Sequence, residues 1–171
     1  HIEDDAGKLN HDDFGGGSLI DLNRAGVPLI EIVSEPDLRS AEEVESYIKK
    51  LKSILEYIEV SDCKMQEGSL RADVNVSIHK PGEPFGTRTE MKNMNSFRSI
   101  TRAINYEVDR QIDVLEDGGK VYQETLRWDD VSGKTFPMRD KEDAQDYRYF
   151  PEPDLVAIKL SEEYIDNIRT K

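Results

Sequence analysis

The chain has 171 residues and a mass of 19.6 kDa, and its 36 acidic residues against 23 Lys and Arg give a formal net charge of −13. This length fits one domain, or one and a fraction, and a core that needs no disulfide or metal to fold. The single cysteine, Cys63, excludes an internal disulfide and a multi-cysteine zinc site, and is typical of a reducing compartment. No stretch approaches the roughly 20 apolar residues of a membrane span. The acidic charge argues against binding nucleic acid by bulk charge alone.

The N-terminal residues predict a loop followed by a strand. Residues 1–17 are acidic and end in three consecutive glycines, which is typical of a loop or turn. Branched residues in 27–33 then predict a strand, with Pro28 near its start. Because the chain starts with His1 and ends in a polar, helix-like stretch, we expect it to be a fragment of a longer protein.

Two amphipathic helices are predicted. Ser40 and Glu43 form a capping-box pattern, and the apolar residues behind them recur at three- and four-residue steps as far as Ile58. A second helix is predicted from Ser96 to Glu116 and is followed by two glycines, which commonly end helices. The first turn of a third helix is predicted at residues 161–163.

The predicted strands carry an unusual number of polar groups. Residues 69–79 alternate between apolar side chains and a polar set that includes Arg71, Asp73 and Asn75. Residues 86–94 predict a second such strand, with Arg88, Glu90 and Lys92 on one side. A hairpin is predicted over residues 121–138, and a last strand over 155–160.

These elements predict an α+β domain with a mainly antiparallel sheet that long helices cover on one face. The other face would then carry the polar side chains of the two alternating strands. Such a face is either plain solvated surface or the floor of a binding site, and the mixture of carboxylate, guanidinium and amide groups leaves both interpretations open.

Acidic side chains occur where they could bind a hard divalent cation. Glu3, Asp4 and Asp5 lie near the N-terminus, Glu67 precedes the first polar strand, and Glu90 lies in the second. Mg²⁺ commonly takes one or two protein carboxylates and completes its shell with water and phosphate oxygens. Arg71, Arg88 and Lys92 would add cations for phosphate oxygens, or alternatively would pair with Asp73 and Glu90 across the sheet.

Familiar nucleotide and nucleophile motifs are absent from the sequence. There is no P-loop, no Gly-x-Gly-x-x-Gly turn and no Gly-x-Ser-x-Gly elbow, so any use of ATP must proceed without the first two of these motifs. The three histidines are not spaced as a metal cluster or a triad, and Cys63 has no base beside it in sequence, which predicts an incidental or buried thiol.

Five stretches resemble the GatB family, which supplies one of the subunits of bacterial and organellar aspartyl/glutamyl-tRNA amidotransferases. They occur in the family's order, which makes a chance match very improbable. They are EDDAGK (3–8), IDLNRAGVPLIEI (20–32), QEGSLRADVN (66–75), EMKNMNSF (90–97) and DYRYFPEPDL (146–155).

The resemblance implies an ATP-dependent enzyme with a glutamine synthetase-like catalytic cradle. In the family, ATP phosphorylates the side chain of Glu-tRNA(Gln) or Asp-tRNA(Asn), and ammonia from an amidase-type A subunit displaces the phosphate, with a small C subunit completing a heterotrimer. The implied cofactors are ATP and Mg²⁺, and the implied location is the bacterial cytoplasm. The resemblance implies metal ligands at Glu3, Asp4, Glu67 and Glu90, catalytic roles for Glu67, Glu90 and Arg71, and substrate positioning by Arg71, Asp73, Asn75, Lys92 and Asn93.

The sequence also departs from the family pattern. We expect residues 1–160 to be the central and C-terminal part of the cradle and residues 161–171 to begin the following helical segment. We expect two parts of the family's pattern to lie outside this chain. One is the N-terminal strand, with its metal-binding Glu and His and the paired cysteines of many members, and the other is the set of C-terminal domains that contact tRNA. Without the Glu and His of that strand, we expect half a metal site and no activity from the chain alone. Asp4 stands where relatives often have Glu and is one methylene shorter, which argues against direct metal contact there.

Two alternative functions remain open at this stage. One is a non-catalytic docking module for the partner subunit or the tRNA acceptor end, and the other is a glutamine synthetase-like ligase acting on a free small molecule. The sequence does not indicate a preference between the two tRNA substrates or the surface that meets the A subunit.

Overall fold

The computed structural model describes residues 2–11, 17–138, 153 and 156–171, with the side chains of 8–11 excepted. The chain divides into two compact units, His1–Pro137 and Met138–Lys171. Most of the DYRYFPEPDL stretch lies outside the described residues.

The N-terminal segment forms two short antiparallel pairs. Strand β1 (Ile2–Asp4) pairs with β4 (Pro28–Ile30), and β2 (Lys8–His11) pairs with β3 (Ser18–Asp21). The prediction of a loop over residues 1–17 is therefore wrong at β1 and β2. The strands that pair with them come from later in the chain, and local composition does not reveal such partners.

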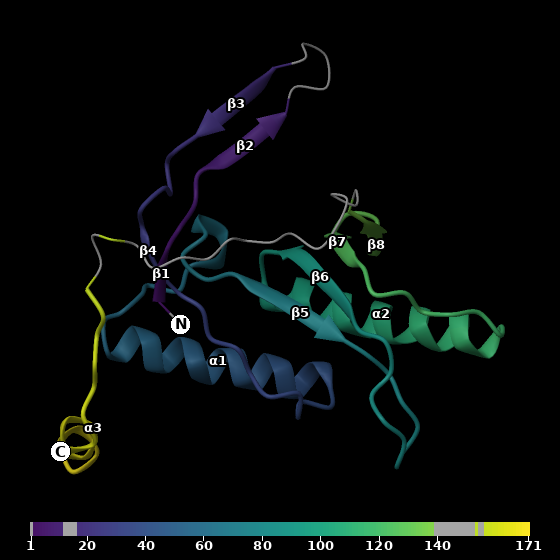
Figure 1. Ribbon diagram of the computed structural model, residues 1–171. Helices are drawn as coiled ribbons and strands as arrows, with labels where there is room; N and C mark the ends of the chain where they lie inside the picture. The colour runs from purple at the N-terminus through teal and green to yellow at the C-terminus, as the bar shows by residue number, and fades with distance from the viewer. Residues whose placement is uncertain (1, 12–16, 139–152, 154–155) are drawn as a thin grey trace. The chain divides into compact units, whose positions relative to one another are not determined.

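A four-stranded sheet forms the centre of the first unit (Figure 1). Its strands β5 (Ala72–Val76), β6 (Thr89–Met94), β7 (Thr125–Asp129) and β8 (Lys134–Pro137) follow one another in that order across the sheet. The two outer pairings are antiparallel, whereas β6 and β7 run parallel. The parallel pairing arises because a long helix carries the chain between these two strands.

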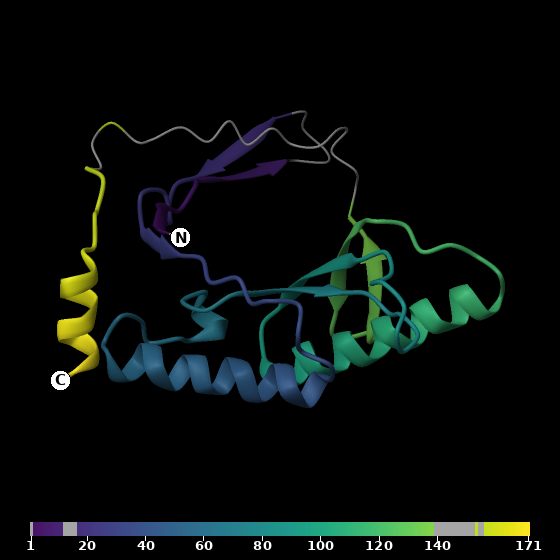
Figure 2. The same ribbon diagram turned by 60° about the horizontal axis from the view of Figure 1, so that its bottom comes forward.

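The predicted helices are confirmed as elements. Helix α1 (Ala41–Tyr57) is capped by Ser40, whose Oγ accepts from the Glu43 N–H at 3.2 Å, and α2 (Phe97–Glu116) is capped in the same way by Ser96. Gly118 follows α2 with a φ of 76°, a conformation that glycine adopts without strain. Both helices lie on the same side of the sheet (Figure 2).

The core lies between this sheet and the two helices. Met91, Leu126 and Trp128 point from the strands toward the helices and are at most 2% exposed. The helices add Ala41, Ile48, Ile100, Ala103 and Ile104 to the same cluster. The protein is thus a mixed α/β structure with one helix-covered sheet face and one open face.

A β-bulge interrupts the pairing of β5 and β6. Ala72 lies opposite Met94 and Val74 opposite Met91, so one more residue stands between these positions on β6 than on β5. Asn93 takes up the irregularity with a φ of 72°, and its side-chain amide donates to the Trp128 carbonyl at 3.0 Å. The bulge turns Met94 into the core and leaves Asn93 exposed.

The second unit contains helix α3 (Glu162–Arg169), capped by Ser161. Residues 156–160 form no strand, so the last predicted strand is wrong over its described part; Val156, Ile158 and Leu160 are all exposed there. Across the described ranges, the helices lack an apolar stretch long enough for crossing a membrane.

Candidate functional site

Two rows of polar side chains cross the open face of the sheet. In the first row, Glu90 on β6 lies between Asn75 on β5 and Thr125 on β7. In the second row, Lys92 on β6 lies between Asp73, beside the bulge, and Arg127 on β7. The rows exist because period-2 alternation sends every second side chain of three adjacent strands to the same face.

Lys92 forms two ion pairs on this face. Its Nζ donates to Asp73 Oδ2 at 2.5 Å and lies 3.1 Å from Glu90 Oε1. Partial burial by itself would lower the pKa of Lys92, but the two carboxylates outweigh it and raise that pKa above its usual value. The structure thus contains the ion-pair alternative for Lys92, which pairs with Asp73 on the neighbouring strand and with Glu90 on its own strand.

Both carboxylate oxygens of Glu90 are engaged. Thr125 Oγ1 donates to Glu90 Oε2 at 3.0 Å, while Lys92 contacts the other oxygen. Glu90 is half-buried, and its position between two strands fixes its backbone on both sides. Its carboxylate is thus held in a defined orientation over the sheet.

Arg71 is bound to the N-terminal strand pairs and not to the sheet carboxylates. Its guanidinium donates to Asp5 Oδ2 at 2.6 Å, and Arg24 Nε lies 3.8 Å from the same oxygen. The Asp5 side chain is only 12% exposed. The sequence predicts Asp5 only as a member of the acidic cluster with Glu3 and Asp4, and neither its pairing with Arg71 nor a role for Arg24 was predicted.

The remaining predicted residues are spread over the molecule. Glu67 ends a short 3-10 helix (Met65–Glu67), is exposed and pairs with Lys64 at 3.2 Å. Glu3 is half-buried on β1, and Asp4 beside it is exposed. In the part of the chain that the structure describes, no three His, Cys, Asp or Glu side chains gather closely enough to hold a metal ion. The four predicted metal ligands are therefore not brought into one cluster here.

Thr125 and Arg127 are site residues that sequence reasoning missed. Their signal is present in the segment Thr125–Asp129, where Leu126 and Trp128 are buried and the residues between them face the other way. The pattern does not show that this strand lies beside β6, because the whole of α2 separates the two strands in sequence.

A buried polar network lies on the opposite, helix-covered face. Glu107 of α2 is 0% exposed, and its Oε1 accepts from Thr89 Oγ1 at 2.8 Å, from Gln111 Nε2 at 3.0 Å and from Arg110 at 2.7 Å. Burial would raise the pKa of Glu107, but the hydrogen bonds from Arg110, Gln111 and Thr89 outweigh it and lower that pKa. Since Thr89 precedes Glu90 on β6, this network anchors the strand that carries Glu90.

The oxygen atoms of the open face suit a hard cation better than a soft one. Asp73 and Glu90 supply two carboxylates, and the Asn75 amide and the Thr125 hydroxyl lie on the same face. Mg²⁺ accepts such a set because one or two protein carboxylates suffice when phosphate oxygens complete the shell. The Lys92 ammonium stands between the two carboxylates, so a cation bound by both would have to displace it.

Known sequences match the chain over its whole length. The GatB/GatE catalytic domain family matches residues 1–166. Among its relatives are aspartyl/glutamyl-tRNA(Asn/Gln) amidotransferase B subunits from three bacteria. The sequence identity is 68% for Lachnoclostridium phytofermentans, 64% for Caldicellulosiruptor bescii and 60% for Brevibacillus brevis, each over 99–100% of this chain. The chain spans 36% of the length of these relatives. It belongs to the GatB/GatE catalytic domain family.

Proposed function

We propose that the chain is the catalytic part of a tRNA-dependent amidotransferase. The whole protein would convert Glu-tRNA(Gln), Asp-tRNA(Asn) or both into the amidated forms, using ATP to phosphorylate the aminoacyl carboxylate and ammonia to displace the phosphate. The names of its relatives support this substrate class. One observation supports the location of the chemistry, namely the two polar rows that cross the open sheet face.

The proposed chemistry divides among the residues of these rows. Phosphoryl transfer needs positioned cations and a metal that offsets the developing negative charge, with little covalent work by the protein. Bound Mg²⁺ would supply the positive charge that offsets it, and Asp73 and Glu90 are the sheet residues whose oxygens would hold the metal. Lys92, once released from these carboxylates, would bind a phosphate oxygen, and the amides of Asn75 and Asn93 would orient the acyl group.

The roles proposed for residues outside the sheet depend on Arg71. Its ion pair with Asp5 ties it to the segment that also carries Glu3 and Asp4. We propose that Arg71 exchanges Asp5 for a phosphate oxygen when substrate binds. Glu3, Asp4 and Glu67 remain proposed metal ligands, which would require a rearrangement or groups beyond this chain to complete the set.

The wider assignment also remains a proposal. Residues 1–160 would form the central and C-terminal part of a glutamine synthetase-like cradle, and 161–171 would begin the following helical segment. An amidase-type A subunit would supply ammonia and a small C subunit would complete the complex. The mischarged tRNA would be bound mainly by other domains, which is compatible with the charge of −13 on this chain.

The decisive experiment measures amidation by the full-length protein in its complex, with free ammonia in place of glutamine. Free ammonia bypasses glutamine hydrolysis, so the assay isolates the step assigned to this chain. We expect Glu90→Gln to lower the rate by about 100-fold or more, which corresponds to roughly 2.7 kcal/mol of transition-state stabilisation.

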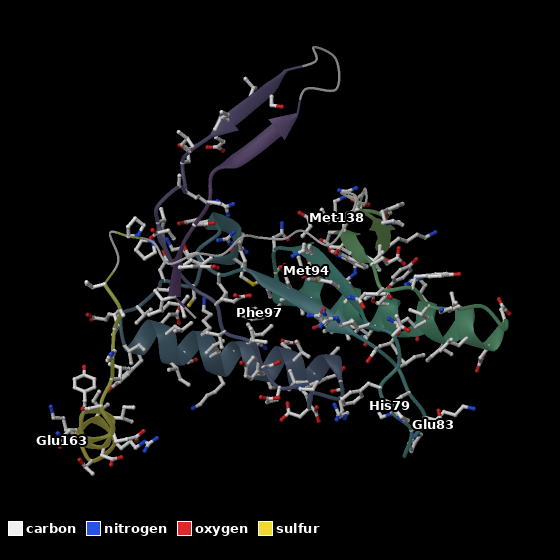
Figure 3. The ribbon with its side chains drawn as sticks, in the orientation of Figure 1. His79, Glu83, Met94, Phe97, Met138 and Glu163 are labelled. Atoms are coloured by element: carbon white, nitrogen blue, oxygen red, sulfur yellow. The ribbon has the colours of Figure 1, made fainter. Side chains whose placement is uncertain are left out.

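Glu83→Gln is the matched control for the same chemical change. Glu83 lies in the loop between β5 and β6 and is exposed (Figure 3), so its variant should keep the native rate. A Glu90→Gln enzyme within a few-fold of native would indicate a docking or structural surface instead. Amidation of free glutamate or aspartate without tRNA would favour a small-molecule ligase.

A further inference from the structure

Arg127 is a cation on an interior strand of the open face. It lies in the centre of β7, with Lys92 opposite it on β6 and Phe136 opposite it on β8. Its neighbours in sequence, Leu126 and Trp128, are buried at 2% and 1%, so the alternation of the strand places the Arg127 side chain on the open face.

Two other cations near this face are paired with carboxylates. Lys92 contacts the carboxylates of Asp73 and Glu90, and Arg71 contacts Asp5. Among the residues that the structure describes, no carboxylate oxygen lies within 4.0 Å of the Arg127 guanidinium nitrogens.

The nearest acid on the same strand face, Asp129, is engaged elsewhere. Its carboxylate accepts from the backbone N–H of Ser132 at 2.9 Å in the β7–β8 turn. The hydrogen bonds from Ser132 are the main reason why the pKa of Asp129 is lowered, and Arg127 adds only a weaker, longer-range attraction. Asp129 therefore helps to close the turn and forms no direct ion pair with Arg127.

Lys92 and Arg127 lie opposite each other on the parallel strands β6 and β7. Asp73 and Glu90 offset the charge of Lys92, and neither carboxylate forms an ion pair with Arg127. A guanidinium has a planar fork of donors that matches two oxygens of a phosphate group, and the adjacent ammonium would contact a third.

We propose that Arg127 binds an oxyanion on the open face, and that this oxyanion is the terminal phosphate region of ATP. The inference rests on the proposed function, because ATP is the phosphate donor of that reaction. Lys92 and Arg127 would then hold the phosphate oxygens from two neighbouring strands, above the row in which Glu90 lies. Binding of the anion would draw Lys92 away from its carboxylates and so free them for a metal ion.

The test uses the full-length protein in its complex and follows ammonia-dependent amidation at varied ATP and varied charged tRNA. We expect Arg127→Gln to raise the KM for ATP by about 10- to 100-fold, as loss of a charge-assisted hydrogen bond implies. The KM for charged tRNA should change by less than about threefold. Arg127→Lys keeps the charge but loses the fork, so its KM for ATP should lie between those of the native and Gln enzymes.

Lys134→Gln is the matched control. Lys134 lies on β8 on the same sheet face and is exposed, so its variant removes one positive charge at the sheet edge without touching the Lys92–Arg127 pair. Its KM for ATP should stay native. An equal rise in both variants would mean a general charge effect and would overturn the assignment to Arg127.

The remaining outcomes separate the inference from the proposed function. If Arg127→Gln is kinetically native while Glu90→Gln is inactive, Arg127 is a solvated side chain and only the inference fails. If the change appears in the KM for charged tRNA, the oxyanion belongs to the tRNA and the ATP assignment is overturned. If neither variant affects amidation, the proposed function itself fails. Should Arg127→Gln not assemble, the intermediate KM expected of Arg127→Lys decides the question.

Discussion

The two faces of strand β6 carry ionic groups in opposite environments. On the helix side, Thr89 bonds to Glu107, and both residues are 0% exposed. On the open side, Glu90 and Lys92 form an ion pair whose side chains are 34% and 37% exposed. Only one position along the chain separates Thr89 from Glu90, so a single strand connects a buried network with a half-exposed one.

This difference indicates which groups hold the strand and which are available to a ligand. A buried carboxylate that loses its partners cannot be rescued by water, so breaking such a network is strongly destabilising. Half-exposed pairs are weak because water and salt compete with them, and their members exchange partners readily. The helix side therefore fixes β6, whereas the ion pairs of the open side can exchange partners.

The largest expected effect is on the buried side. Glu107→Ala removes the acceptor of Thr89, Gln111 and Arg110, and should lower the free energy of unfolding by roughly 3 kcal/mol. Urea unfolding of the 171-residue chain can be followed by the fluorescence of Trp128, its only tryptophan. Asp109→Ala, an exposed change on the same helix, should stay within about 0.5 kcal/mol of native. Equal losses in the two variants would contradict the comparison.

The same network has a pH signature. The pKa of Glu107 is lowered in the folded state, so its stabilisation is present above the ordinary glutamate pKa of about 4.3 and is lost as pH falls through the lower folded value. Unfolding free energies measured between pH 7 and 3 should therefore fall more steeply below about pH 4.3 in the native chain than in Glu107→Gln. Parallel curves would show that Glu107 contributes nothing through its charge.

A smaller effect on the free energy of unfolding is expected at Asn93, in the β-bulge between β5 and β6. Asn93 has a φ of 72°, so Asn93→Ala loses the bond to the Trp128 carbonyl and keeps a Cβ in a left-handed conformation that asparagine tolerates better than alanine. Asn93→Gly loses the same bond but also removes the Cβ. The alanine variant should be about 1 kcal/mol less stable than the glycine variant in the same urea assay. The reverse order would mean that the bulge relaxes when Asn93 is replaced.

The smallest effect is expected at the Arg71–Asp5 pair. The Arg71 side chain is 42% exposed, so Asp5→Asn should cost less than about 1 kcal/mol of unfolding free energy. Because salt screens such pairs, the difference between Asp5→Asn and native should shrink as NaCl is raised from about 0.05 to about 1 M. A loss that is large and independent of salt would place Asp5 among the buried, fixed groups.

Elements with local signals are predictable from the sequence. Helices α1 and α2 have capping serines at their starts and apolar residues at helical spacing, and the predicted bounds lie within a residue or two of the observed ones. The alternation of Asp73, Asn75, Glu90 and Lys92 likewise predicts strand positions on one face, which the sheet confirms. These features depend on neighbours only a few residues away.

Features that depend on distant partners are not predictable in this way. The acidic N-terminal residues form strands because β4 and β3 pair with them, and the pairing of Arg71 with Asp5 spans 66 positions. The parallel β6–β7 contact, which brings Thr125 and Arg127 into the site, also joins segments separated by a helix. Periodicity reports which side chains share a face, but it does not report which strands are neighbours.

The parallel connection through α2 also sets the order in which the site can assemble. Asp73, Glu90 and Lys92 come together through a hairpin that is complete by Met94, whereas Thr125 and Arg127 join only after the chain has closed a much longer loop around α2. Closing a longer loop costs more entropy and slows the formation of non-local contacts. During synthesis the carboxylates would therefore stand beside Lys92 first, and the second cation would arrive last, after its helix has packed.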